Sequence, residues 1–166
     1  RVHPTLLKKE HPLASVGDVF NAVFVHGDAV DDTMFYGRGA GELPTASAVV
    51  GDIIEVARNI KDNCLARTGC SCYRELPIKP IGEIESKYFV RMIVKDCAGV
   101  LGHVAIILGE HEVSIDQIIQ RAAEGDIAEI VAITDVVQEK KFRAAIETLN
   151  AMEFVQDVSS IIRAYA

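Results

Sequence analysis

The sequence predicts an α+β protein in which a C-terminal βαββαβ domain follows a shorter segment of strand, hairpin and helix. Residues 87–166 hold four strand patterns and two helix patterns in the order strand, helix, strand, strand, helix, strand. Residues 1–60 hold apolar strands followed by one helical stripe. Between the two segments, residues 61–86 have no sustained period and contain Pro77 and Pro80. This composition predicts a linker.

The first segment reads as a strand, a hairpin and a helix. Pro4 interrupts the first strand pattern, and Gly27-Asp28 marks a turn between the next two, which indicates a hairpin. In the helix pattern, apolar residues recur on one face, and Pro44 suits the first turn, where a missing N–H costs little. The predicted elements are strands over residues 2–7, 19–26 and 32–38 and a helix over residues 44–60.

The second segment is more regular. Its second helix pattern places Phe142, Ala145, Ile146, Leu149 and Met152 on one face. The element order predicts a ferredoxin-like arrangement, an antiparallel sheet with two helices on one face. The predicted elements are strands over residues 87–95, 113–121, 126–136 and 158–165 and helices over residues 99–111 and 138–152.

Composition excludes several classes of function. The net charge is -7 with a pI of about 5.2, and no Lys/Arg cluster is present, which argues against binding nucleic acid. No apolar run reaches the roughly 18 residues that cross a bilayer, so no membrane partner is predicted. No signal peptide is recognisable, and we expect a cytoplasmic protein. Because Arg1 leads directly into a strand pattern, we expect the chain to start inside a longer protein.

A glycine-rich loop lies between the predicted hairpin and the first helix. Gly37, Gly39 and Gly41 are spaced two apart. Glycine lets a backbone approach a ligand closely, and a following helix offers N–H groups and a positive dipole end. The spacing differs from the dinucleotide fingerprint G-x-G-x-x-G, because the third glycine comes one residue early. From spacing alone, a ligand-facing loop and a plain glycine turn both stay open.

A second loop follows the strand over residues 87–95. Asp96 and Gly99 precede a helix, so the loop can offer N–H groups to a carboxylate and a carboxylate to an ammonium group. Together these groups match an amino acid zwitterion. The alternative is that Asp96 caps the turn and Gly99 only forms it.

The four cysteines predict no metal site. Cys64, Cys70 and Cys72 form C-x5-C-x-C, which is not a standard zinc spacing, and Cys97 stands apart. We favour reduced thiols in a cytosolic protein, with a thiol or metal module as the alternative.

Two stretches resemble a known family. The stretch HPLASVGDVFNAVFVHGDAVDDTMFYGRGAGELPTASAVVGDIIE resembles the last part of the catalytic region of homoserine dehydrogenase. The stretch YFVRMIVKDCAGVLGHVAIILGEHEVSIDQIIQ resembles the ACT domain that many bacterial members carry at the C-terminus. The resemblance implies NAD(P)-dependent interconversion of aspartate 4-semialdehyde and homoserine, on the route to threonine, methionine and isoleucine. It also implies that residues 1–60 are a remnant of an α/β catalytic region and that residues 87–166 form an ACT domain.

The resemblance also assigns sites. It implies that Gly39, Ala40 and Gly41 contact the nicotinamide cofactor, NADP or NAD, in the full-length parent. It places the catalytic residues upstream, so none lies in this chain and the chain alone is expected to be inactive. For the ACT domain it implies an amino-acid effector, most often threonine, and pairing through sheets as a homodimer or homotetramer. The expected effector-binding residues are Asp96, Gly99, Val100, Leu101, Val113, Ser114 and Ile115. The alternative function is a stand-alone amino-acid-binding or dimerisation module without catalysis.

Overall fold

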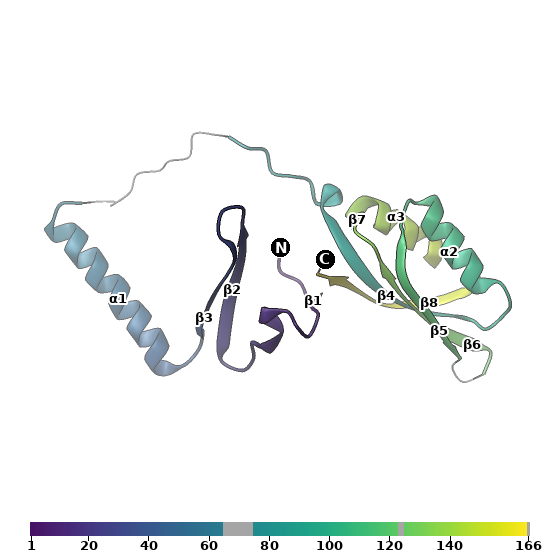
Figure 1. The fold of residues 1–166 in the computed structure, drawn as a ribbon, viewed down its shortest axis with the longest axis horizontal. Coiled ribbons are helices and arrows are strands. Elements are labelled where there is room, and N and C mark those ends of the chain that lie inside the picture. Colours follow the sequence, from purple (N-terminus) through teal and green to yellow (C-terminus); the bar gives the residue numbers. More distant parts are fainter. Residues whose placement is uncertain (65–74, 123–124, 166) are drawn as a thin grey trace. The chain divides into compact units, whose positions relative to one another are not determined.

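The chain folds into two compact units in a computed structural model that describes residues 1–64, 75–122 and 125–165. One unit consists of Arg1–Leu7 and Pro77–Ala166, and the other of Lys8–Leu76 (Figure 1). We call the first the regulatory unit, after the role expected from the sequence, and the second the hairpin unit, and we describe each by itself. Among the described helices, none combines the length and apolar character that crossing a membrane requires.

The regulatory unit confirms the predicted α+β class and the βαββαβ order. Its strands pair in the order β1-β8-β4-β6-β5, and short β7 pairs with the start of β4. Apart from the parallel pair β1 and β8, all these pairings are antiparallel. The elements are β4 (Glu85–Lys95), α2 (Val100–Glu110), β5 (Ile115–Ala122), β6 (Ile127–Thr134), β7 (Val137–Gln138), α3 (Glu139–Asn150) and β8 (Val155–Ala164).

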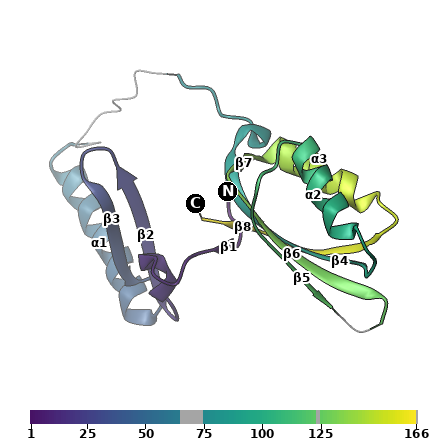
Figure 2. The ribbon, with the colours of Figure 1, turned by 45° about the vertical axis from the view of Figure 1, so that its right-hand side comes forward.

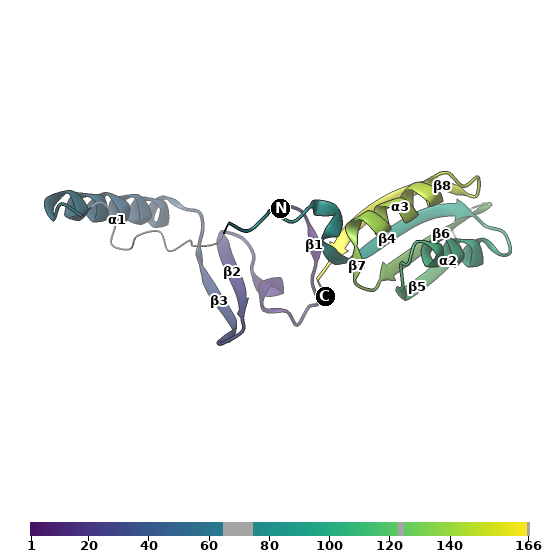
Figure 3. The ribbon, with the colours of Figure 1, turned by 90° about the horizontal axis from the view of Figure 1, so that it is seen from above.

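The core of this unit lies between the sheet and the two helices. Helices α2 and α3 lie on the same face of the sheet (Figure 2 and Figure 3). Side chains alternate between buried and more exposed along β4 and β6, as expected of strands with one covered face. The apolar faces predicted for the helices point into this core. The fully buried apolar side chains include Met92, Val94, Val104, Ala128, Ile130, Ala145 and Leu149.

The N-terminal strand belongs to the regulatory sheet. Strand β1 is only Thr5–Leu6, and it pairs in parallel with β8 through Thr5 opposite Arg163 and Leu6 opposite Ala164. The Leu6 carbonyl accepts a hydrogen bond from the Tyr165 N–H at 2.9 Å. The strand predicted over residues 2–7 is therefore shorter than expected, because Pro4 has no N–H to donate to a ladder.

The residues just before β4 also pack on this unit. A short 3-10 helix, η2 (Ile81–Glu83), precedes the strand, and the Ile84 carbonyl accepts a hydrogen bond from the Glu139 N–H at 2.9 Å. A Cβ on Gly82 would lie 3.3 Å from Lys140 Cβ, so this turn closely approaches α3. The end of the segment predicted as a linker is thus held against the start of α3.

The hairpin unit contains the elements expected from the first segment. Strands β2 (Phe20–Gly27) and β3 (Asp31–Arg38) form an antiparallel hairpin, and α1 (Glu42–Lys61) follows (Figure 2). A 3-10 helix, η1 (Pro12–Ser15), precedes the hairpin and was not predicted. None of the described residues of this unit is buried, although α1 carries an apolar stripe. Its apolar surface therefore has no cover within the unit itself.

Candidate functional site

The glycine loop connects β3 to α1 with an uncapped helix start. The Gly39 N–H donates to the Val19 carbonyl at 2.9 Å, which holds the loop against the strand entering the hairpin. Gly41 is the N-cap of α1, and no side chain caps this end. The loop residues Gly39, Ala40 and Gly41 are all exposed. The loop therefore presents backbone groups at the positive end of a 20-residue helix.

Gly39 and Gly41 are both needed for the shape of this loop. Gly41 has φ 124° and ψ 153°, a conformation that residues with a side chain rarely adopt. A Cβ on Gly39 would lie 1.9 Å from Asn21 Nδ2, so any side chain there would displace Asn21. At both positions the geometry of the loop itself therefore favours glycine.

The second predicted site begins in the loop after β4. The Asp96 N–H donates to the Asp126 carbonyl at 2.9 Å, and the Asp96 side chain is exposed. Gly99 is left-handed at φ 92° and is the N-cap of α2, with no side-chain cap. Val100 is buried at 4% exposure and Leu101 packs partly against the core. The Asp96 carboxylate and the uncapped amino end of α2 therefore belong to one loop.

The other predicted effector residues lie at the far end of α2. Val113 is buried, and its N–H donates to the Leu108 carbonyl at 2.9 Å. Ser114 is exposed, and Ile115 opens β5, the last strand of the sheet order. Helix α2 has 11 residues and so is about 16 Å long. Within one chain the structure therefore separates the Asp96–Leu101 loop from the start of β5 by the length of this helix.

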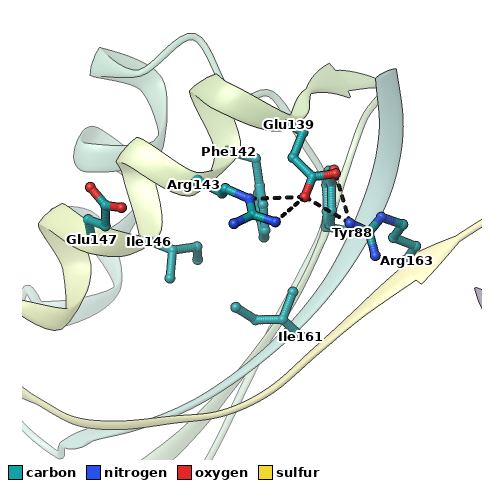
Figure 4. A pocket seen from close by; sticks show the side chains of 8 residues that line it. All are labelled: Tyr88, Glu139, Phe142, Arg143, Ile146, Glu147, Ile161 and Arg163. Carbon is teal, nitrogen blue, oxygen red and sulfur yellow. Dashed lines mark hydrogen bonds and ion pairs between the residues drawn. The ribbon is translucent and has the colours of Figure 1, made fainter. Parts of the chain in front are cut away.

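A third feature, a charged cluster around Glu139, was not predicted. Glu139 opens α3 with a side chain that is 2% exposed, and arginines from three segments bind it. Figure 4 shows two of them, Arg143 and Arg163. Arg163 Nη2 donates to both carboxylate oxygens, Arg143 Nε and Nη2 donate to Oε1, and Arg1 Nη1 donates to Oε2. Tyr88 Oη also donates to Oε2 at 3.2 Å. Only the spacing of Glu139 and Arg143, four residues apart on a helix, is readable from sequence.

The electrostatics of the cluster follow from this geometry. Burial alone would raise the pKa of Glu139, but hydrogen bonds from Arg163 and Arg143 outweigh it and hold the pKa at about 2. Burial raises the pKa of Tyr88, and the negative charge of Glu139 adds to that rise. Glu139 is therefore ionised and Tyr88 protonated at neutral pH.

The thiol and metal alternative concerns residues that are only partly described. Cys64 is partly exposed and Cys97 is exposed, while Cys70 and Cys72 lie outside the described residues. Within the described ranges, no three His, Cys, Asp or Glu side chains gather where they could hold a metal ion.

Two family profiles match the chain in succession. The profile of homoserine dehydrogenase matches residues 1–54, and the ACT domain profile matches residues 88–154. The first match includes β1, which the structure pairs with the sheet of the second.

Individual relatives agree with both profiles. The chain is 41% identical over 168 residues to a homoserine dehydrogenase of Synechocystis sp. and 42% identical over 163 residues to one of Corynebacterium glutamicum. Each comparison covers 98% of this chain but only 39% and 36% of the relative. A crystal structure of a homoserine dehydrogenase from Thiobacillus denitrificans gives a TM-score of 0.87 at 35% identity, over 99% of this chain and 38% of that chain. The chain thus spans less than two fifths of the length of these relatives.

Proposed function

We propose that the chain is the C-terminal region of a feedback-regulated homoserine dehydrogenase and that its second half is the ACT domain of that enzyme. Its reaction interconverts aspartate 4-semialdehyde and homoserine with NADP or NAD, in the cytoplasmic synthesis of threonine, methionine and isoleucine. The observation that carries this proposal is the succession of the two profiles along one chain.

We assign the glycine loop to the cofactor side of this reaction. Gly39, Ala40 and Gly41 would lie beside the nicotinamide cofactor, which carries the transferred hydride. The support is the exposed loop backbone, the uncapped start of α1, and a conformation at Gly41 that residues with a side chain rarely adopt. The role of these three residues would be to position the cofactor. The groups that transfer protons would come from a part of the protein outside this chain.

The apolar surface of the hairpin unit fits this assignment. Helix α1 exposes large apolar side chains and buries none within the described residues. Contiguous exposed apolar patches mark interaction surfaces. We propose that the remaining part of the catalytic region covers this helix in the whole protein. The exposed side chains include Val49, Val50, Ile53, Ile54, Val56 and Ile60.

We propose that the ACT domain binds its effector between two copies. The Asp96–Leu101 loop and the start of β5 lie at opposite ends of α2, so one ligand reaches both only if they come from different chains. Strand β5 is the last strand of the sheet order, and an edge strand offers unpaired backbone groups to a partner. Asp96 would bind the effector's ammonium group. The N–H groups at the start of α2 would bind the effector's carboxylate. The proposed effector is threonine, and the proposed assembly is a homodimer or homotetramer.

On this proposal the chain divides by role. Residues 1–60 form the end of the catalytic region, and residues 61–86 link it to the ACT domain. Residues 87–166 form that domain and regulate the enzyme. Strand β1 is an exception, because it pairs with the sheet of the regulatory unit. The test is to assay homoserine oxidation by the full-length protein and by this chain alone. Turnover by the full-length protein and none by the chain is expected. Amino-acid binding without turnover by either protein would favour the stand-alone regulatory module.

A further inference from the structure

A cavity of about 340 Å³ opens between α3 and β8, beside the Glu139 cluster (Figure 4). Its volume lies at the lower end of the range for small-molecule sites, roughly 300–1,000 Å³. It lies near the start of β4, whereas the Asp96 loop follows the end of that strand. Eight residues separate Tyr88 from Asp96, about 26 Å of extended strand, so the two sites are separate.

One part of the cavity wall is apolar. The rings of Tyr88 and Phe142 are stacked with centroids 3.7 Å apart, which fixes the orientation of Phe142. Ile146 on α3 and Ile161 on β8 line the cavity with them. Ile161 is 44% exposed although it is a large aliphatic side chain. This wall would favour an aliphatic group, because burying apolar surface stabilises binding.

The rest of the wall carries charges of both signs. Arg143 and Arg163 line the cavity together with Glu139 and Glu147. Three guanidinium groups, including that of Arg1, surround the single carboxylate of Glu139, which leaves an excess of positive charge at this end. Glu147 lies one helical turn beyond Arg143 on α3. The cavity therefore has a cationic end and a separate carboxylate along the same helix.

The arginines retain donors for a further anion. Arg143 donates Nε and Nη2 to Glu139, but a guanidinium has five N–H donors, and the Arg143 side chain is 64% exposed. Arg163 Nε is buried and has no hydrogen-bond acceptor among the described residues. A ligand carboxylate can therefore bind Arg143 without displacing Glu139.

We propose that this cavity binds a small aliphatic α-amino acid, as a second ligand site separate from the Asp96 loop. Its carboxylate lies against the outer edge of Arg143, its ammonium group faces Glu147, and its side chain packs on Phe142, Ile146 and Ile161. The cationic end and the separate carboxylate of Glu147 match the two charges of a zwitterion better than those of a simple anion. Because Glu139 also binds Arg1, the ligand would lie beside the contact that holds the segment leading to β1.

Calorimetric titration of the 166-residue chain with L-valine, L-leucine and L-isoleucine tests the site. At least one should bind with a micromolar to millimolar Kd. Arg143→Gln should weaken binding on the order of tenfold or more, because a charge-assisted hydrogen bond is lost. The matched control is Arg91→Gln, since Arg91 binds Glu129 through Nε and Nη2 in the same manner and does not line the cavity. This variant should bind as the parent chain does.

Further arms separate the proposed site from its alternatives. Analogues of the bound amino acid that lack the ammonium or the carboxylate group should each bind at least tenfold more weakly. Asp96→Ala should leave this binding unchanged. No binding by a folded chain up to about 10 mM of all three amino acids would overturn the proposal. Equal affinity in Arg143→Gln, or loss of binding in Asp96→Ala, would overturn it as well.

Discussion

Arg163, near the end of β8, donates Nη2 to both carboxylate oxygens of Glu139 at the start of α3, at 2.8 and 2.7 Å. This contact joins the last strand of the regulatory sheet to its second helix. The same carboxylate accepts from Tyr88 on β4 and from Arg1, just before β1. One buried side chain thus links four separate segments of the regulatory unit.

Glu139→Gln should destabilise the regulatory unit by about 3 kcal/mol at pH 7. Removing one partner of a buried ion cluster leaves the remaining charges uncompensated, and here the guanidinium groups remain. The measurement is urea unfolding of the chain followed by circular dichroism. Glu129→Gln is the control, because the Glu129 side chain is 23% exposed, against 2% for Glu139, and its loss should cost less than about 1 kcal/mol. Equal costs for the two variants would contradict the role given to Glu139.

The same carboxylate should make stability depend on pH in acid. The pKa of Glu139 is about 2 in the folded chain, against an ordinary value of 4.5. Because the pKa of Glu139 is lower in the folded chain than in the unfolded chain, ionised Glu139 stabilises the folded state. This stabilisation is fully present above about pH 5 and is lost as the pH falls toward 2. The shift corresponds to about 3 kcal/mol. As the pH falls from about 5 toward 2, the free energies of unfolding of the parent chain and of Glu139→Gln should converge. If the two free energies instead keep a constant difference over this pH range, Glu139 is not the group responsible.

Gly41→Val should impair cofactor use in the full-length protein. Valine is strained at φ 124°, and its Cβ would lie 3.3 Å from Pro44 Cδ on the loop surface. We expect kcat/KM for the cofactor to fall at least tenfold, about 1.4 kcal/mol or more. Melting curves recorded in parallel should show a much smaller change in stability.

Gly51→Ala on α1 provides the matched control for that variant. Nothing lies within 4 Å of a Cβ at Gly51 among the described residues, and alanine favours a helix by about 1 kcal/mol over glycine. This variant should keep normal cofactor kinetics. A normal cofactor KM and kcat in Gly41→Val would show that the loop does not contact the cofactor. A loss of activity fully explained by unfolding would also count against this role.

Asp96→Ala should weaken threonine binding by the chain. Losing a charge-assisted hydrogen bond to the ammonium group costs about 1.5–3 kcal/mol, or roughly ten- to a hundredfold in Kd. Calorimetry measures the effect, and Asp157→Ala, an exposed aspartate on β8, serves as the control. If the affinity for threonine is unchanged in Asp96→Ala, Asp96 does not bind the effector and serves only to cap the turn.

Mixing two variants tests whether the effector site is shared between chains. Ser114→Trp should block binding at the start of β5, as Asp96→Ala does at the loop. Mixed dimers would pair an intact loop from one chain with an intact β5 start from the other, so binding should return in mixtures. If both halves of the site came from one chain, mixing would restore nothing.

Much of the regulatory unit could be predicted because its pattern is local. The apolar faces of α2 and α3 and the alternation along β4 each follow from periodicity within one element. The parallel pairing of Leu6 with Ala164 could not be predicted, since two-residue strands carry no pattern and their partners lie far away in sequence. The Glu139 cluster was missed for the same reason, because Arg1 and Arg163 lie 138 and 24 residues from it.

The sites were predictable only in part. The loop glycines Gly39, Gly41 and Gly99 stood out because glycine is needed where backbone geometry is unusual. The stripe on α1 predicted the helix correctly but not that its apolar face would lack a cover among the described residues of the hairpin unit. The separation of Asp96 from Ser114 required the direction and length of α2, which only the folded chain provides.

The initial rate of NAD(P)H formation from homoserine by the full-length protein, with and without threonine, tests the central claim most directly. The proposed function predicts turnover with at least one of the two cofactors and a lower rate when threonine is added. Absence of turnover with both cofactors, in a folded full-length protein, would contradict it.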